Sequence, residues 1–296
     1  MIKTYNYTVR ELQPYINWSY FYWIWQIPAL TARNAPPNSE SAQLDSSEEA
    51  VKEQWDVLFN DVKTILGEYD RQQYTVSARV GLFDANANGD DILVYRDNDT
   101  VTIPCLRQQY EKKDHEPNLC LSDYLMPQSL GKHDRMGVFA CTVPMEMETH
   151  YADDPVYKLF GQTLCTRLVE AAAEKMHEEV RKRLWGYAPD ESLTMEEMFH
   201  EKFQGIRPAI GYPSLPDQTV NFIVDGLIDM QGMGITFSEN GAMLPQATVS
   251  GLMFAHPQSR YFHIGIGPDQ LEDYARRRRL PVETLKKFLA TYLTFR

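Results

Sequence analysis

A chain of 296 residues is long enough to bury a substantial core, in one large domain or two small ones. Its net charge of −12 argues against unaided binding to nucleic acid or to an anionic membrane. There is no run of about 18 apolar residues that would span a bilayer, and the N-terminal stretch lacks the apolar core of a signal peptide. We therefore expect a cytoplasmic protein with no nucleic-acid partner and no membrane partner.

The sulfur and imidazole side chains form no metal-binding pattern. The four cysteines include no Cys-x-x-Cys pair and stand at Cys105, Cys120, Cys141 and Cys165. The seven histidines are scattered and form no His-Glu-x-x-His motif. A chain of this size does not need disulfides to fold, so we expect reduced thiols and no structural zinc.

The N-terminal part is predicted to contain a segment of large aromatic side chains, then a loop, then a helix. Residues 15–30 are the most aromatic stretch and are predicted to fill the core. Residues 31–47 are polar and rich in turn formers, which predicts a surface loop. Ser46 and Glu49 form a capping box, and apolar residues at helical spacing follow as far as Leu66. This pattern predicts a helix with one buried face.

The middle of the chain is predicted to form strands joined by tight turns. Residues 75–83 (TVSARVGLF) alternate between apolar and polar, and the Asn-Gly of DANANGDD favours a hairpin. Further short strands are predicted in the segments ILVYR, TVTIPCL, GVFACTV, VSGLMFA and RYFHIGIG. Strands that are joined by tight turns pair in the antiparallel direction. The sequence therefore predicts an antiparallel sheet.

Helices are predicted to alternate with the later strands. The longest spans about residues 155–184, and most of its glutamates are expected on a solvated face. A short helix is predicted after Thr194 and another after Asp217, each of which is a capping residue. Two C-terminal helices are expected to divide at Pro281, with the arginines at 276–279 on a solvated face. These elements predict an α+β fold, a twisted antiparallel sheet with segregated helices, in a single domain covering 1–296.

The segment QGIRPAIGYPSLPDQT at 204–219 has the strongest local constraints. Three prolines and two glycines fall within it, and each proline forces the preceding residue out of the helical region. The segment is therefore predicted to be a stiff, extended loop that carries Arg207 and Tyr212 at a fixed separation. Two interpretations remain open. The arginine could bind a ligand carboxylate through two parallel hydrogen bonds, or it could pair with a nearby Asp in a proline-stiffened connector.

The sequence RPAIGYP followed by PDQT resembles the signature of the activation domain of cobalamin-dependent methionine synthase. Other stretches resemble this family in the same order along the chain: YINWSYFYWIW, GDDILVYRD, LRQQYEKK, CLSDYL, LVEAAAEKMHEEVRK, VSGLMFAHPQSRYF and EDYARRRRLPVETLKKFL. The resemblance covers nearly the whole chain. In that family the Arg-Pro-Ala-x-Gly-Tyr-Pro loop binds S-adenosylmethionine, and the resemblance implies the same ligand here.

The resemblance also implies a set of binding residues. Arg207 would bind the ligand carboxylate, and the main chain from Ala209 to Gly211 would meet the adenine edge. Aromatic faces would come from Tyr261 and Phe262, and Tyr212 of the loop would also belong to the site. Hydrogen-bond acceptors would come from Asn17 and Glu170. No catalytic residue and no metal ligand is implied.

The implied function is reactivation of a methionine synthase whose cobalamin has been oxidised. The cobalamin belongs to a partner methionine synthase that lacks its own activation domain, and the electron comes from a flavodoxin-like donor. This chain would act in trans and would supply no nucleophile of its own. Two alternatives stay open: a module that binds S-adenosylmethionine and serves or senses another corrinoid protein, and a structural partner whose pocket is empty.

One position departs from the family pattern. The family usually has Ile-Asp-Trp where this chain has Ile16-Asn17-Trp18. Asparagine keeps one acceptor oxygen but loses the charge and gains an NH₂ donor. The resemblance therefore implies weaker ligand binding at Asn17, whereas the local sequence also allows Asn17 to cap a turn without touching a ligand.

Overall fold

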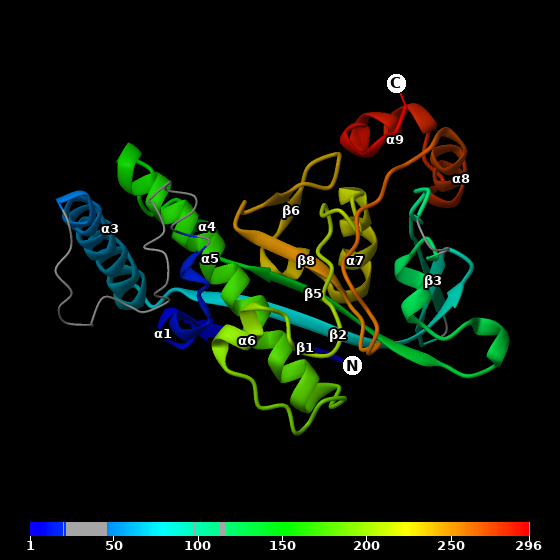
Figure 1. The fold of residues 1–296 in the computed structure, drawn as a ribbon, viewed down its shortest axis with the longest axis horizontal. Coiled ribbons are helices and arrows are strands. Elements are labelled where there is room, and N and C mark those ends of the chain that lie inside the picture. Colours follow the sequence, from blue (N-terminus) through cyan, green and yellow to red (C-terminus); the bar gives the residue numbers. More distant parts are fainter. Residues whose placement is uncertain (20, 22–45, 98, 113–115, 296) are drawn as a thin grey trace.

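A twisted six-stranded antiparallel sheet forms the centre of the molecule (Figure 1). The computed structural model describes residues 1–19, 21, 46–97, 99–112 and 116–295. Most of the predicted surface loop at 31–47 and most of the aromatic stretch therefore lie outside the described residues, and the last two positions of that loop belong to the helix that begins at Ser46. The strand order is β4-β3-β2-β5-β8. The sixth strand, β1, pairs with the same edge of β2 as β3 does. The bounds are β1 Ile2–Thr8, β2 Thr75–Asn88, β3 Asp91–Arg96, β4 Asp99–Pro104, β5 Asp134–Thr142 and β8 Thr248–Met253.

The longest strand, β2, organises the sheet because its two halves have different partners. Its first half pairs with β1, from Thr75 opposite Thr8 to Gly81 opposite Ile2. Its second half pairs with β3, and its other edge pairs with β5 along most of its length. All named strand pairs are antiparallel, which confirms the predicted pairing.

Helices cover both faces of this sheet. The first face carries α1 (Val9–Leu12), α3 (Ser46–Arg71), α4 (Met145–Glu148) and α5 (Pro155–Glu179), which a π-helical turn extends over Val180–Leu184. The second face carries α7 (Asn221–Ile228), α8 (Pro268–Arg278) and α9 (Val282–Phe288). The remaining short elements are α6 (Met195–Phe199) and a two-stranded ribbon of β6 (Thr236–Phe237) and β7 (Met243–Leu244). Single 3-10 turns lie at Gln13–Tyr15, Leu121–Tyr124, Gln128–Leu130, Gln218–Val220, Gln231–Met233 and Ala290–Tyr292.

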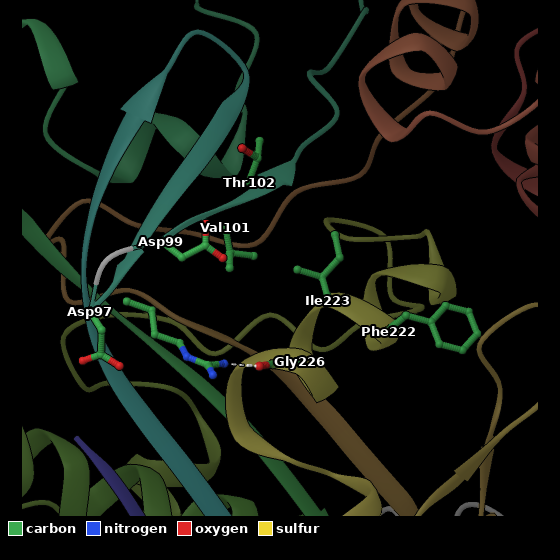
Figure 2. A pocket seen from close by; sticks show the side chains of 8 residues that line it. Asp97, Asp99, Val101, Thr102, Phe222, Ile223 and Gly226 are labelled. Atoms are coloured by element: carbon green, nitrogen blue, oxygen red, sulfur yellow. Dashed lines mark hydrogen bonds between the residues drawn. The ribbon is translucent and has the colours of Figure 1, made fainter.

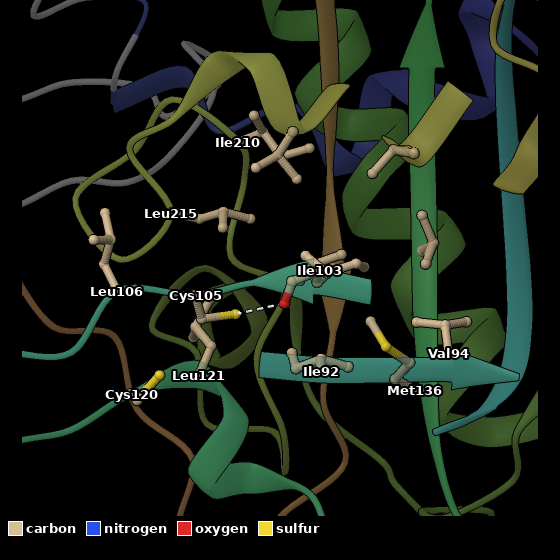
Figure 3. Packing of buried hydrophobic residues seen from close by; sticks show 14 of the residues in the cluster. Ile92, Val94, Ile103, Cys105, Leu106, Cys120, Leu121, Met136, Ile210 and Leu215 are labelled. Carbon is tan, nitrogen blue, oxygen red and sulfur yellow. Dashed lines mark hydrogen bonds between the residues drawn. The ribbon is translucent and has the colours of Figure 1, made fainter. Parts of the chain in front are cut away.

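The alternation of strand side chains divides the core into two clusters. On β5, Val138 and Ala140 face one cluster while Phe139 and Cys141 face the other, as the two-residue period of a strand requires. The cluster on the second face contains Ile92 and Ile103 (Figure 3). It also includes residues of the C-terminal helices. Burying an aliphatic side chain of this kind stabilises the fold by about 1.5–3 kcal/mol. All four cysteines are buried and free.

Several predicted helix ends are confirmed by their caps. Thr194 and Glu197 form the capping box of α6, and Asp217 accepts a hydrogen bond from Thr219 N at 2.9 Å. The two C-terminal helices divide at Pro281, as predicted. Within the described ranges, we find no helix that is both long and apolar enough to cross a membrane.

Two predictions about strands and charges are wrong. The segment RYFHIGIG forms no strand, and only Ile266 makes a bridge, to Leu293. The arginines at 276–279 do not share one solvated face. Arg277 bonds Asp91, Asp273 and the carbonyl of Cys105, and its side chain is 14% exposed. Arg278 is 7% exposed and pairs with the buried Asp217.

Candidate functional site

The first part of the loop at 204–219, residues 206–210, lies along the outer edge of β8. Ile206 and Phe254 exchange two main-chain hydrogen bonds, at 3.0 and 2.9 Å. Further along, Ile210 N donates to Ser250 O at 2.9 Å, and Leu252 N donates to Pro208 O at 3.1 Å. The extended conformation that the prolines predict is therefore confirmed for residues 206–209. The chain turns at residues 210–214, where Leu215 N donates to Tyr212 O, and Gln218–Val220 form a 3-10 turn. The loop also covers an edge strand that would otherwise leave its main-chain groups unpaired.

Two glycines allow the loop and the strand to approach closely. Gly205 has a φ of +90°, and a Cβ there would lie 2.4 Å from the Phe254 carbonyl oxygen. A Cβ on Gly251 would lie 2.4 Å from the Pro208 carbonyl oxygen. A side chain at either position would push the loop off β8, because carbonyl oxygens of the main chain cannot move aside. These glycines therefore fix how closely the loop that carries Arg207 lies against β8.

The far end of the loop is anchored by a buried charge network. Asp217 accepts from Thr219 N and Oγ1 at 2.9 and 2.7 Å, and from the Tyr274 hydroxyl at 2.9 Å. Arg278 Nε lies 3.2 Å from the same carboxylate, and its Nη2 donates to Thr219 Oγ1. A buried carboxylate with this many donors is satisfied. The network therefore ties the loop to α8.

Arg207 makes hydrogen bonds with three groups, of which two come from α5, and its guanidinium carbon lies 5.8 Å from the centre of the Phe203 ring. Its Nη1 donates to Glu174 Oε1 at 3.3 Å, and its Nη2 donates to Glu174 Oε2 at 2.5 Å. His177 Nδ1 lies 3.2 Å from the same Nη1. The main-chain N–H of Arg207 donates to the Tyr261 hydroxyl at 3.1 Å. The expected pairing with a nearby Asp is therefore wrong, because the partner is a glutamate on a distant helix.

Glu174 corrects the expectation of a solvated glutamate face on α5. Its side chain is 8% exposed because it lies between the helix and the loop. Glu170, Glu174 and His177 follow one another at intervals of four and three residues, which places them on one face of the helix. This spacing was visible in the sequence, but nothing in the sequence indicates that this face meets the loop.

The electrostatics keep Arg207 charged and His177 neutral. Burial is the largest influence and opposes the charged form of Arg207, but Glu174, Tyr261 and Glu170 together outweigh it and the net pKa is raised. Glu170, which is half-buried, lies close enough for its charge to act on Arg207 as well. Burial lowers the pKa of His177 well below its usual value, and the charges of Arg207 and Arg181 lower it further. The imidazole is therefore uncharged at neutral pH.

Two of the three predicted aromatic residues are exposed, and one of them, Tyr261, contacts the main chain of Arg207. Tyr212 is 57% exposed and Tyr261 is 39% exposed. Phe262 is 7% exposed and belongs to the core cluster on the second face, and the ligand contact expected of its ring stays a prediction. Its main chain is held by Ser214, whose hydroxyl donates to Phe262 O and accepts from Phe262 N. The alternation along this extended segment exposes Tyr261 and buries its neighbour.

The predicted main-chain contacts at Ala209 to Gly211 are partly engaged by the protein itself. Ile210 N donates to Ser250 O, Gly211 N donates to Leu215 O, and Gly211 O accepts from the Tyr292 hydroxyl. Among the described residues, no hydrogen bond engages the N–H of Ala209 or the C=O of Ile210. One donor and one acceptor are therefore left on adjacent residues of the loop.

Asn17 caps a helical turn that begins at Trp18. Its Oδ1 accepts a hydrogen bond from Ser19 N at 3.2 Å, and the residue is half-buried. Nearby, Tyr15 donates to Glu178 on α5 at 2.8 Å. No contact among the described residues joins Asn17 to Arg207 or Glu170. The structure thus supports the capping role, and the predicted ligand contact remains a prediction.

A separate surface hollow lies between the β3–β4 hairpin and α7 (Figure 2). It is lined by charged residues of the hairpin, such as Asp97 and Asp99, and by Phe222 and Ile223 of α7. Arg96 also lines the hollow, and its guanidinium donates a hydrogen bond to the Gly226 carbonyl. None of the predicted site residues lines it.

The antiparallel sheet and the helices that cover it make this chain an α+β domain. The loop with the desolvated Arg207, which faces the glutamates of α5, is its candidate small-molecule site. A family model described as "Vitamin B12 dependent methionine synthase, activation domain" matches residues 8–279. The chain belongs to this family.

A solved structure shares the fold. Its description reads "Crystal Structure of the MetH Reactivation Domain bound to AdoHcy". The two chains are 35% identical with a TM-score of 0.87, and the match covers 100% of this chain and 91% of that chain. The similarity confirms the predicted fold class and the family resemblance.

Proposed function

We propose that this chain binds S-adenosylmethionine between the 204–219 loop and α5. The family match and a similar domain that was solved with AdoHcy support the choice of ligand. The observation that carries the proposal is the state of Arg207: its guanidinium is largely desolvated, yet its Nε–H has no hydrogen-bond partner among the described residues. A charged group held in this way can bind a ligand carboxylate strongly.

Each part of the ligand has a chemically matched group in this proposal. The carboxylate meets the open edge of Arg207. The adenine edge presents an amino donor beside a ring-nitrogen acceptor, which matches the open C=O of Ile210 and the open N–H of Ala209. The ring of Tyr261, which is 39% exposed, offers a flat face, and an aromatic ring near a sulfonium adds a cation–π attraction.

The proposed task is to present the methyl group to a cobalamin that a methionine synthase carries. When bound on that partner, the reduced cobalamin supplies the nucleophile that takes the methyl group. We infer that this chain acts in trans in the cytoplasm, and that a flavodoxin-like protein donates the electron. The residues described here would contribute only binding and orientation, which is the usual division of work between a protein and a cofactor.

Calorimetry with S-adenosylmethionine and S-adenosylhomocysteine tests the binding step. Ligand at 100 times its dissociation constant should raise the free energy of unfolding by roughly 2.7 kcal/mol. An unchanged melting temperature at millimolar ligand, together with no binding heat, would contradict the proposal.

Recovery of activity tests the second step. An oxidised, inactive methionine synthase that lacks this domain is mixed with a reductant and S-adenosylmethionine, with and without this protein. Equal recovery in both samples would show that the trans-acting role is wrong. Binding without recovery would favour the alternative of a module that serves another corrinoid protein.

A further inference from the structure

We propose that His177 is a positioning residue that holds the Arg207 guanidinium with one edge open to the ligand carboxylate. This inference rests on the proposed binding of S-adenosylmethionine, and it adds a residue that never touches the ligand. His177 is fully buried on α5 and lies between Arg207 and Tyr187. It was not among the site residues that the sequence predicted.

The arginine fixes the tautomer of this histidine. A guanidinium has only donors, so the 3.2 Å contact between Arg207 Nη1 and His177 Nδ1 requires a lone pair on Nδ1. Since the ring is neutral, the proton must be on Nε2. That nitrogen lies 3.4 Å from the Tyr187 hydroxyl and donates to its oxygen. The tautomer is thus assigned from the hydrogen-bond network.

The network then returns to the loop from which it started. The Tyr187 hydroxyl donates its own proton to the carbonyl of Gln204 at 3.3 Å. Gln204 lies three residues before Arg207, and its side chain donates to Ala255 O at 2.7 Å. Donors therefore run in one direction, from Arg207 to His177, to Tyr187 and to Gln204. A chain of this kind holds both ends of one short loop segment against α5.

The count of guanidinium hydrogens shows what this arrangement leaves open. Arginine has five N–H groups. Both hydrogens on Nη1 are engaged, one by Glu174 and one by His177, and Glu174 engages one of the two on Nη2. The Nε–H and the second Nη2–H remain, and they point along the same edge of the planar group. That edge has the spacing that binds both oxygens of a carboxylate.

His177 is the contact that selects this edge. Glu174 alone would allow the guanidinium to rock about its Nη1–Nη2 side, because the arginine stem is flexible. The contact from His177 to Nη1 removes this freedom before the ligand arrives. Less conformational entropy is then lost on binding, so affinity rises without any new ligand contact.

Two nearly isosteric variants separate positioning from simple packing. His177→Asn keeps an acceptor near the place of Nδ1, whereas His177→Leu has a similar shape and no acceptor. The test is calorimetric titration of each variant with S-adenosylhomocysteine and with 5′-methylthioadenosine, which lacks the amino-acid part. We expect the leucine variant to bind S-adenosylhomocysteine roughly tenfold more weakly, equivalent to about 1.4 kcal/mol. The asparagine variant should recover most of this loss, and both should bind 5′-methylthioadenosine like the wild type.

Equal losses for both ligands would overturn the proposal, because they would mean that the variants damage the whole site. Wild-type affinity of the leucine variant for S-adenosylhomocysteine would also overturn it. Tyr187→Phe provides a milder variant should the leucine protein fail to fold, and it should weaken only the carboxylate-bearing ligand. The nitrogen-15 spectrum of the unliganded protein gives an independent readout. It should show an unprotonated Nδ1 on His177, and a proton there would refute the positioning role even if the wild type binds neither ligand.

Discussion

Replacement of Arg207 by alanine should damage both the fold and ligand binding. The guanidinium pairs with Glu174, whose side chain is only 8% exposed. Without the arginine, that carboxylate stays buried with no cation, and His177 loses its donor. Removal of one partner from a buried ion pair costs about 3–5 kcal/mol in unfolding free energy. We expect a loss of that size for Arg207→Ala.

A double variant separates the two effects. Arg207→Met keeps the apolar stem, and Glu174→Gln keeps the shape of the carboxylate without its charge. Replacing both members of a buried pair by neutral groups of similar volume is often close to neutral, so we expect the unfolding free energy to return to within about 1 kcal/mol of wild type. The binding free energy should stay weaker than that of the wild type by on the order of 2–5 kcal/mol, because the ligand carboxylate still lacks its partner.

The assay combines urea unfolding with calorimetric titration of S-adenosylhomocysteine. Unfolding midpoints at unchanged slope report stability, and the full cycle with the single variants Arg207→Met and Glu174→Gln gives the coupling between the two residues. Wild-type affinity in the double variant would show that Arg207 is purely structural. A loss below about 1 kcal/mol for Arg207→Ala would refute the desolvated ion pair, since exposed pairs contribute about that much or less.

Three further outcomes are expected. The pKa of His177 in the folded protein lies well below its unfolded value of about 6.5. The neutral imidazole therefore contributes fully to stability above pH 6.5, and this contribution is lost as the pH falls below that value. The melting temperature of His177→Asn should fall less between pH 7.5 and 5.5 than that of the wild type. Gly205→Ala should cost about 1–3 kcal/mol, because its Cβ would strike the Phe254 carbonyl, whereas the control Gly67→Ala, on an open helix face, should stabilise by about 0.5–1 kcal/mol. Asn17→Asp should tighten S-adenosylmethionine binding by roughly 1 kcal/mol if the residue meets the ligand, since bonds to charged groups are stronger; equal calorimetric affinities would leave it as a cap only.

The elements that the sequence predicts best are those whose signals are local. Prolines and glycines set the extended and turned parts of the loop at 204–219, and capping residues set the starts of α6 and of the turn before α7. These features depend on residues within three or four positions of one another. The antiparallel pairing also follows from short turns between neighbouring strands.

Strands that depend on distant partners were not predicted correctly. Residues 2–8 form β1 although their side chains are mostly exposed, because the first half of β2 offers a free edge. The segment RYFHIGIG has a strand-like pattern but forms none. The outer edge of β8, beside which it would have paired, is already occupied by Ile206 and Ile210. Context of this kind decides strand formation more than propensity does.

Buried charges were missed for the same reason. Arg278 stands in a run of arginines that looks solvated, and its partner Asp217 lies 61 positions earlier. Asp217 was predicted correctly as a cap, and it performs that role with one oxygen. Its other oxygen meets Tyr274 and Arg278. A sequence pattern can assign one use to a side chain, but not the second use that packing gives it.

Arg207 shows the same principle at the candidate site. The sequence left two interpretations open, a ligand-binding arginine and a structural ion pair, and treated them as alternatives. A planar guanidinium has two edges, and the side chains of α5 occupy only one of them. The ion pair with Glu174 holds the group in place, and the remaining edge is free to bind a carboxylate. The structural contact is therefore the condition for the proposed binding role, because an unpaired arginine on a flexible stem would have to be ordered by the ligand itself.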